Sequence, residues 1–191
     1  MSSDGSKLAA CEDYGYIYTS IDGGNSWGVQ TSAGGRSWQS IVMSSDGTKL
    51  AACVSGGYVY TSTDGGKTWT EQTSAGDRDW VSITMSSDGT RLTACVSGGY
   101  IYTSTDGGKT WTEQTSAGSR HWWRIAMSSD GKKLAACVYG GYIYTSMDGG
   151  ITWTEEKNAG VGNWNSITMS GDGCKIAAVN NGKQGVWIGT R

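Results

Sequence analysis

Four aspartates recur in one short pattern and are the first candidates for chemistry. They are Asp22, Asp64, Asp106 and Asp148, and each stands in a Ser-x-Asp-x-Gly-x-x-Trp segment, as in "STDGGKTW". A carboxylate can serve as an acid, a base or a ligand, but an aspartate before glycine can also hold a turn by accepting backbone N–H groups. Four identical active sites would be an odd arrangement for an enzyme, so the pattern favours the structural role.

Each of these segments ends in a tryptophan, which predicts packing beside the turn. The four tryptophans are Trp27, Trp69, Trp111 and Trp153. An indole places a large apolar face between sheets and keeps one N–H for a partner, and the glycine supplies the positive φ that a tight turn needs. None of these roles requires catalysis.

A second recurrent set, of arginines and tryptophans, is the better candidate for ligand binding. It consists of Arg36, Arg78 and Arg120, each followed two residues later by a tryptophan, and of the tryptophans Trp38, Trp80, Trp122 and Trp164. Arginine offers a planar fork of donors to an anion or a sugar, and an indole face can stack on sugar C–H groups. The alternative is that the tryptophans, which open a strand, are core residues and that the arginines are solvated loop residues.

A few residues break the repeat and could mark a site. Tyr139 stands where the preceding copy has Ser97, and the fourth copy has Gly162 where the others have arginine. His121 and Trp123 occur in one repeat only, and a lone histidine of this kind is more often a drifted surface residue than a base or a ligand.

The elements that must position these residues follow from an internal repeat. "MSSDG" or "MSGDG" begins at residues 1, 43, 85, 127 and 169, a period of 42 without insertion, and the chain holds 31 Gly, 10 Trp and 10 Tyr but no Pro. This composition is typical of many short strands joined by tight turns, and a period of 40–45 residues with strand patterning is typical of propeller blades.

One period predicts four strands joined by Asp-Gly and Gly-Gly turns. In the third copy we expect them at residues 80–85, 91–96, 100–104 and 109–114, with "TSAGSRH" leading into the next first strand. The chain begins after the first strand of one repeat and ends before the fourth strand of another, so 18 strands are expected as three, then three sets of four, then three. We therefore predict an all-β β-propeller of four-stranded antiparallel blades in one domain, residues 1–191, with five blades of which the terminal two are incomplete.

The recurrent aspartate segment resembles the Asp box of the BNR, or sialidase-type, repeat. Four copies at a fixed spacing, each between a third and a fourth strand, make the resemblance specific, and it covers essentially the whole chain. The segments are also similar to those of photosystem-assembly propellers of the Asp-box type. The resemblance implies that the Asp box is a structural turn on the face opposite the ligand site, which places any site among the connections of the other face.

The resemblance to sialidases extends to the scaffold alone. Their catalytic set implies three arginines, a Tyr–Glu nucleophile pair and a separate Asp acid at non-equivalent positions, whereas the arginines here repeat and only "EDY" at residues 12–14 stands outside the pattern. We therefore predict no catalytic residue, no metal site and no cofactor, because calcium-loop, phosphate-loop and dinucleotide patterns are also missing from the sequence.

The net charge, the hydropathy and the positions of the cysteines narrow the remaining classes of function. A net charge of −2 does not predict nucleic-acid binding, and no stretch of 18 apolar residues predicts a membrane span. Cys11, Cys53, Cys95 and Cys137 repeat every 42 residues, which predicts small buried side chains held apart, and Cys174 is expected to be a lone thiol. Unpaired cysteines and the lack of a signal-peptide pattern in this sequence favour a cytoplasmic setting.

Three functions stay open at this point. The first is a non-catalytic propeller that binds a glycan or a protein through its variable loops. The second is a structural or self-assembling repeat protein, natural or engineered, because residues 55–76 and 97–118 differ only at Val59 and Ile101 and because incomplete terminal blades favour self-association. The third, most remote, is a sialidase-like glycoside hydrolase.

Overall fold

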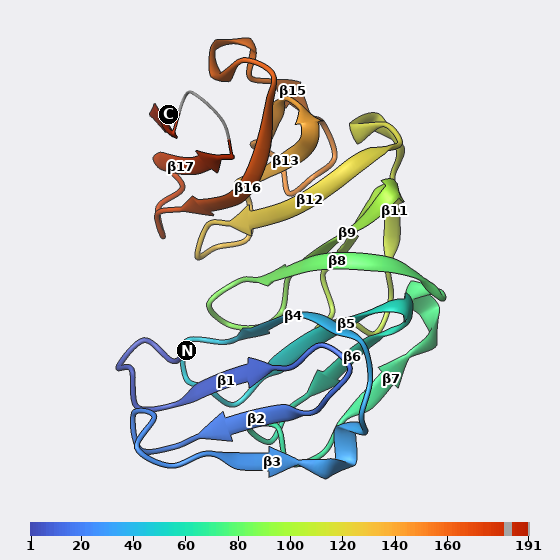
Figure 1. The fold of residues 1–191 in the computed structure, drawn as a ribbon, viewed down its shortest axis with the longest axis vertical. Coiled ribbons are helices and arrows are strands. Elements are labelled where there is room, and N and C mark those ends of the chain that lie inside the picture. Colours follow the sequence, from blue (N-terminus) through green and yellow to red (C-terminus); the bar gives the residue numbers. More distant parts are fainter. Residues whose placement is uncertain (182–184, 191) are drawn as a thin grey trace.

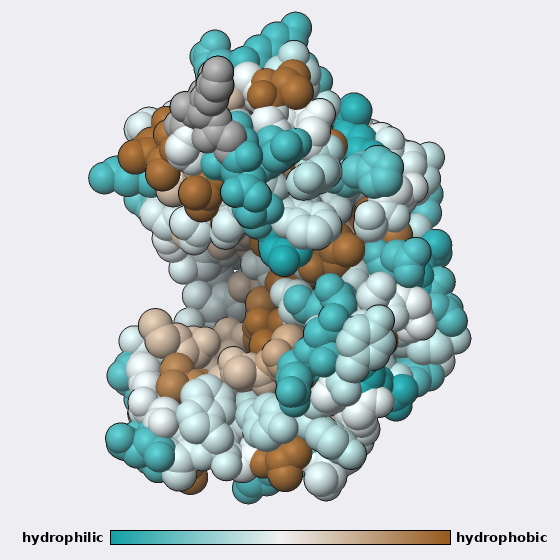
Figure 2. Space-filling model, viewed as in Figure 1, coloured by the Kyte–Doolittle hydropathy of each residue, from teal (hydrophilic) through white to brown (hydrophobic). Residues whose placement is uncertain are grey.

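The chain folds into an arc of five antiparallel blades, which we number 1 to 5 in chain order (Figure 1), and short pairings between neighbouring blades join blades 2 to 5 into one hydrogen-bonded sheet. The structure is a computed structural model and describes residues 1–181 and 185–190. Blade 1 and blade 5 lie at opposite ends of the arc, and the surface is hollowed between them (Figure 2). The prediction of an all-β propeller fold is confirmed.

Three complete blades stand between two three-stranded ones. Blade 1 contains β1 (Leu8–Cys11), β2 (Ile17–Ser20) and β3 (Gly28–Gln30). Blade 2 contains β4 (Trp38–Met43), β5 (Leu50–Gly57), β6 (Val59–Ser62) and β7 (Thr70–Gln72). Blade 3 contains β8 (Arg78–Met85), β9 (Leu92–Gly99), β10 (Ile101–Ser104) and β11 (Thr112–Gln114). Blade 4 contains β12 (Arg120–Met127), β13 (Leu134–Gly141), β14 (Ile143–Ser146) and β15 (Thr154–Glu155). Blade 5 contains β16 (Gly162–Met169), β17 (Lys175–Asn180) and β18 (Val186–Thr190). The expected division of 18 strands into three, three sets of four and three is confirmed.

The strand boundaries differ from the predicted ones at both ends of a repeat. In blade 3, β8 begins at Arg78 and β9 runs to Gly99, because Gly99 pairs with Arg120 of the next blade's first strand. The fourth strand β11 begins only at Thr112, since the Asp-box turn takes up the preceding residues. Short 3-10 turns follow the fourth strands: η1 (Thr31–Ala33), η2 (Thr73–Ala75), η3 (Thr115–Ala117) and η4 (Lys157–Ala159).

The 42-residue period fails once, after Asn180. In blade 4, Cys137 pairs with Ile143, six residues later, whereas in blade 5 Val179 pairs with Val186, seven residues later. The loop of the fifth repeat is therefore one residue longer than expected, and its residues 182–184 lie outside the described part of the chain. No helix among the described residues is long and apolar enough to cross a membrane.

The blades pack face to face, and each contact has the same composition. One blade contributes its cysteine face, such as Cys95 and Ile101 of blade 3, and the next contributes a tryptophan face, such as Trp122 and Tyr144 of blade 4. Cys53, Cys95 and Cys137 are fully buried in these contacts, and burial raises the pKa of the Cys137 thiol to about 11. The repeated cysteines are thus small core side chains.

Backbone hydrogen bonds join the "SSDG" turns of neighbouring blades. The N–H of Ser3 donates to the Ser45 carbonyl, and the series continues from Ser45 to Ser87, from Ser87 to Ser129 and from Ser129 to Gly171, all at 2.8–2.9 Å. These bonds tie the blades together along one face, which we call the Asp-box face because the Asp-box turns lie there too. The opposite face, formed by the other two kinds of connection, is called the loop face.

Candidate functional site on the loop face

The Asp boxes form four near-identical turns in which the aspartate is fully used. In blade 2 the Ser62 hydroxyl donates to Asp64 at 2.8 Å, and the Thr68 N–H and hydroxyl donate to the same carboxylate at 3.0 and 2.6 Å. The Trp69 indole N–H donates to the Gly66 carbonyl at 2.8 Å. The Thr68 hydroxyl and backbone bonds lower the pKa of Asp64 to about 2. Both carboxylate oxygens hold the turn, which leaves an ionised group poorly placed for acid–base work.

The other copies repeat this geometry. Asp22, Asp106 and Asp148 each accept a serine hydroxyl at 2.8 Å and a second hydroxyl, four residues further on, at 2.6 Å. The glycine two residues after each aspartate has a φ of 92–96°, which a side chain would strain. The indoles of Trp111 and Trp153 bond as Trp69 does, and Trp27 bonds to Gly24 at 3.1 Å.

The strand-opening tryptophans lie in the blade contacts and do not present a stacking surface. Trp38, Trp80, Trp122 and Trp164 are at most 2% exposed. In blade 3 the Trp80 ring meets Tyr102 edge-on at 5.2 Å and Trp111 at 6.1 Å between centroids. These contacts enclose the indole, so stacking of a sugar on these four rings is not supported.

Each repeated arginine connects a loop to a strand, and we call this contact a staple. The Arg78 Nε donates to the Ala75 carbonyl at 3.1 Å, and its guanidinium lies 4.5 Å from the centre of the Tyr102 ring. The Tyr102 hydroxyl in turn donates to Glu113 at 2.5 Å. Burial and this bond raise the pKa of Tyr102 to about 12, the reverse of what an activated nucleophile needs.

Arg36 and Arg120 make the same staples, with Tyr60 and Tyr144 at 4.6 and 4.5 Å. Blade 5 loses the arginine and the tyrosine together, because Gly162 and Trp187 stand at the two positions. This joint loss is what a paired structural contact predicts. Arg36 and Arg120 are nevertheless exposed to solvent.

A β-bulge presents one variable side chain on each first strand. In β12, Trp122 pairs with Val138 and Arg124 with Cys137, so Trp123 is the extra residue, and the same shift occurs in β4, β8 and β16. The bulged residues are Gln39, Val81, Trp123 and Asn165. Bulges often re-aim a side chain beside a functional site. Here a fixed backbone feature carries a different chemical group in each blade.

In blade 4 the bulge builds an aromatic and cationic cluster. The Trp123 and Tyr139 rings lie 5.7 Å apart at 48°, and the Arg124 guanidinium lies 5.0 Å from the Trp123 ring. Arg124 is fixed by two bonds from Nη1, to the Val81 carbonyl at 3.2 Å and to the Trp123 carbonyl at 2.8 Å. Tyr139 is 51% exposed and His121 is exposed on the same strand. We call these four residues the blade-4 cluster.

The other blades have different residues at the positions of the blade-4 cluster. The equivalents in blade 3 are Asp79, Val81, Ser82 and Ser97, which are small or lack aromatic character. Tyr139 was a sequence-based candidate and His121 and Trp123 were noted as unique, but Arg124 was missed. Alignment of the repeats reveals Arg124 as a departure from the repeat, because it replaces a serine found in the three other copies.

A second unusual aromatic residue lies on the same face in blade 1. Tyr14 is 86% exposed and has a φ of 57°, in the left-handed region, whereas the equivalent positions hold Gly56, Gly98 and Gly140. A side chain there is strained by roughly 1–2 kcal/mol. Strained, exposed residues are enriched at binding sites, so Tyr14 adds to the case for the loop face.

The loop face therefore offers aromatic rings and a fixed guanidinium for binding. Within residues 1–181 and 185–190 no group of three or more His, Cys, Asp or Glu side chains is placed to hold a metal ion. The arrangement suits recognition of a ligand that carries aromatic or aliphatic groups together with a negative charge.

Comparison with known proteins identifies the repeat. A family model described as BNR/Asp-box repeat matches residues 60–71 and 102–113, the two copies that are nearly identical. No curated protein matches the chain in sequence.

Solved structures match the fold over almost the whole chain. The GH74 enzyme of Niastella koreensis aligns with a TM-score of 0.77 at 21% identity, over 99% of this chain and 29% of its own. YCF48 from Cyanidioschyzon merolae aligns at 0.68 and 18% identity, over 97% of this chain and 66% of its own. YCF48 bound to D1 peptide aligns at 0.70 and 18% identity, over 97% and 60%. The chain thus spans less than a third of the GH74 enzyme.

Four Asp-box turns, the sequence match to two of them and the shared strand architecture agree with one another. The chain contains BNR/Asp-box repeats and has a β-propeller fold.

Proposed function

We propose that this protein is a non-catalytic binding module that holds an extended segment of a partner protein on its loop face, with the blade-4 cluster as the anchor. The observation that carries the proposal is the convergence of Trp123, Arg124 and Tyr139 at one bulge of an otherwise repeated scaffold. Trp, Tyr and Arg are the residues that most often dominate binding energy at protein interfaces.

The chemistry of the blade-4 cluster favours a peptide with an apolar or aromatic side chain next to an acidic one. Tyr139 is half exposed and stands against Trp123, so a ligand side chain can pack on the pair. Arg124 has one nitrogen committed to two carbonyls, which fixes the guanidinium and leaves its other donors for a carboxylate. A preorganised arginine loses little entropy on binding.

The solved relatives support a peptide ligand. YCF48, which shares the fold, has been solved bound to D1 peptide. The likeness is at 18% identity and concerns the fold, so it supports the class of ligand and not its sequence.

The absence of catalysis is part of the proposal and rests on the state of the candidate groups. Tyr60, Tyr102 and Tyr144, each of which donates to a glutamate of the adjacent strand, are buried, and their pKa values are raised to about 12. The Asp-box carboxylates have pKa values of about 2 and are bonded within their turns. None of these groups is poised to exchange a proton near neutral pH.

Panning a random peptide library on the purified chain tests the proposal. Enriched peptides are then synthesised, and their affinity is measured for the natural chain and for the triple variant Trp123→Val, Arg124→Ser, Tyr139→Ser, which gives blade 4 the residues of blade 3. We expect enrichment of acidic–aromatic peptides and at least a tenfold loss of affinity in the variant, as for loss of an interface anchor.

A matched control is Gln39→Ala, which alters the equivalent bulge of blade 2 and should leave affinity unchanged. Equal binding to the triple variant would refute the role of the blade-4 cluster. Binding on a glycan array that is lost in the same variant would replace the peptide with a sugar. Turnover of a fluorogenic sialoside or of xyloglucan above background would refute the non-catalytic function.

The end of the arc supports a second candidate function, self-association. Val179, Val186 and Ile188 of blade 5 are 46–70% exposed and form an apolar surface, seen as brown atoms at that end in Figure 2. Their equivalents Cys137, Ile143 and Thr145 are at most 3% exposed because blade 5 covers them. Sedimentation of the chain against its Ile188→Asp variant tests this function. A monomer at all concentrations in both would exclude it.

A further inference from the structure

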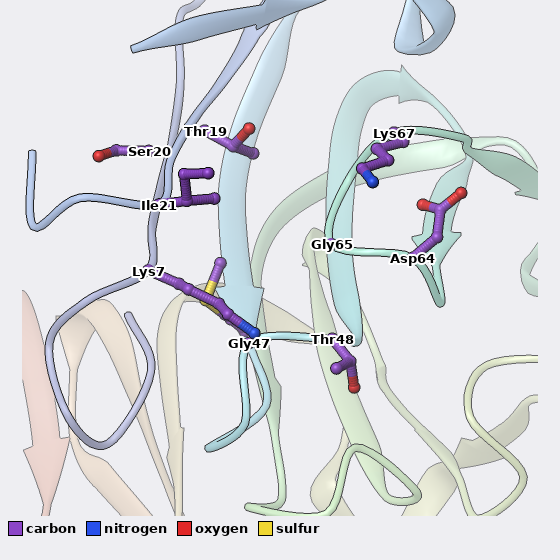
Figure 3. A pocket seen from close by; sticks show the side chains of 10 residues that line it. Lys7, Thr19, Ser20, Ile21, Gly47, Thr48, Asp64, Gly65 and Lys67 are labelled. Carbon is purple, nitrogen blue, oxygen red and sulfur yellow. The ribbon is translucent and has the colours of Figure 1, made fainter. Parts of the chain in front are cut away.

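The Asp-box face carries two matching pockets in successive grooves between blades. The first lies between blades 1 and 2, with a volume of about 240 Å³, and the second between blades 2 and 3, with about 200 Å³. Figure 3 shows the first, with Lys7 and Ile21 on one side and Lys67 and Asp64 on the other. These two pockets are therefore not on the face that carries the blade-4 cluster.

The two pockets are lined from the same repeat positions. Lys7, Met43, Thr48 and Lys67 of the first correspond to Lys49, Met85, Thr90 and Lys109 of the second. The Lys7 ammonium donates to the Asp46 carbonyl and that of Lys49 to the Asp88 carbonyl, both at 2.8 Å. These bonds hold one lysine of each pocket in place.

The second lysine of each pocket has no such anchor. Among the described residues, the ammonium groups of Lys67 and Lys109 make no hydrogen bond or ion pair to the protein. The neighbouring aspartates, Asp64 and Asp106, are already occupied by the hydroxyl and N–H groups of their own turns. Each pocket thus has two cations and one aspartate whose oxygens are committed.

We infer that each pocket binds a small sugar that carries a carboxylate, such as a uronate. The unanchored lysine pairs with the carboxylate, and the methionine floor packs against the C–H face of the ring. The exposed Thr48 hydroxyl on the rim, which already donates to Asp46, accepts a hydrogen bond from a sugar hydroxyl. A volume below the roughly 300–1,000 Å³ typical of drug-sized ligands suits a single sugar unit.

The third groove supplies an internal contrast. At the position of Lys67 and Lys109 it has Ile151, and Arg91 and Lys132 replace Lys49 and Thr90. The inference therefore predicts two sites in this chain and not three. The sites lie on the face opposite the blade-4 cluster, so this inference stands or falls independently of the proposed peptide binding.

Calorimetric titration of the purified chain with sodium glucuronate tests the inference, with glucose as the uncharged match and acetate as the anion without a ring. We expect a stoichiometry of two, affinity at least tenfold weaker for glucose and for acetate, and weakening by salt. Lys67→Gln should leave one site and Lys67→Gln with Lys109→Gln none. Lys157→Gln, at an exposed lysine far from both pockets in sequence, should leave two.

Four results would overturn the inference. No heat with glucuronate, or unchanged stoichiometry in the double lysine variant, would show that these pockets do not hold it. Equal affinity for glucose would remove the role of the lysine, and equal affinity for acetate would leave a general anion site. The gain-of-function variant Ile151→Lys sharpens the test further, because it should add binding in the third groove.

Discussion

Blades 3 and 4 have nearly the same interior and different surfaces. The Trp80–Tyr102 distance of 5.2 Å in blade 3 corresponds to 5.3 Å for Trp122–Tyr144 in blade 4, and the tryptophan pairs match at 6.1 Å. The staple distances are 4.5 Å in both. At the bulge, however, blade 3 carries Val81 and blade 4 carries Trp123.

This difference distinguishes residues that pack the blades together from residues that serve binding on the blade surface. The buried aromatic set is under the same packing demand in each blade, because each must fit the cysteine face of its predecessor. The bulge residue lies at the margin of this packing, because Val81 and Trp123 are only partly buried against their core clusters, so it can change with less repacking than the buried set. A binding site on such a scaffold is therefore found where one repeat departs from the others.

The largest expected effect comes from removing an interior indole. We expect Trp80→Ala and Trp122→Ala each to lower the free energy of unfolding by about 3–5 kcal/mol, since each leaves a large cavity in a blade contact. Guanidinium unfolding followed by circular dichroism measures both. The losses should agree within about 1 kcal/mol, and a much smaller loss in blade 4 would break the equivalence of the two interiors.

Acid should destabilise the blades through their Asp boxes. The folded pKa of Asp106 and of Asp148 is about 2, below the usual value near 4, so folding favours the ionised carboxylate. This stabilisation is fully present above pH 4 and is lost as pH falls from 4 to 2. Asp106→Asn and Asp148→Asn should each cost about 1 kcal/mol at pH 7 and flatten the acid limb of a stability–pH curve. A pH-independent stability between 4 and 2 would contradict this.

Blade 1 offers a test of whether the strained backbone at Tyr14 lowers stability in order to serve binding. Tyr14→Gly should raise the free energy of unfolding by up to about 1 kcal/mol, because glycine adopts the left-handed conformation without a Cβ clash. Thermal unfolding measures the change. Gly98→Tyr in blade 3 is the reverse substitution and should destabilise by a similar amount. Destabilisation by Tyr14→Gly would instead mark Tyr14 as a packing residue.

The smallest stability effect is expected at the blade-4 cluster. The triple variant Trp123→Val, Arg124→Ser, Tyr139→Ser gives blade 4 the residues of blade 3 and should lower the free energy of unfolding by only about 0.5–1 kcal/mol, because Trp123 is only partly buried against its core cluster and the Arg124 bond to the Val81 carbonyl is a single contact. The same unfolding experiment checks this. A loss above about 2 kcal/mol would show that the cluster is a structural contact, and the comparison between the two blades would fail.

Much of the fold could be predicted because the same pattern of turns and strands occurs in successive repeats. Asp-Gly and Gly-Gly turns divide each 42-residue unit into four strands, and the start and end of the chain fix the division of 18 strands. The strand ends could not be predicted, because Gly99 and its equivalents become part of a strand only by pairing with the next blade. The extra residue after Asn180 could not be detected from the 42-residue spacing of the repeated methionines, because the last of these methionines precedes it.

The candidate site was predictable in part. The sequence points to the loop face and to Tyr139, His121 and Trp123 as departures from the repeat. It also offered Trp38, Trp80, Trp122 and Trp164 as stacking surfaces, which burial in the blade contacts does not support. A tryptophan that opens a strand has the same sequence pattern whether its ring faces a ligand or a neighbouring blade, so the pattern could not distinguish the two.

The sequence by itself determined the Asp-box turns, the blade repeat and the order of the strands, because these depend on local turn chemistry and on short-range alternation. Only the tertiary structure decided which aromatic and charged residues face the solvent together. The bulge that exposes Trp123, the ring contact with Tyr139 and the grooves that place Lys7 beside Lys67 all arise from packing between strands or blades distant in sequence. Such contacts depend on register and on the fit of whole faces, which no local pattern encodes.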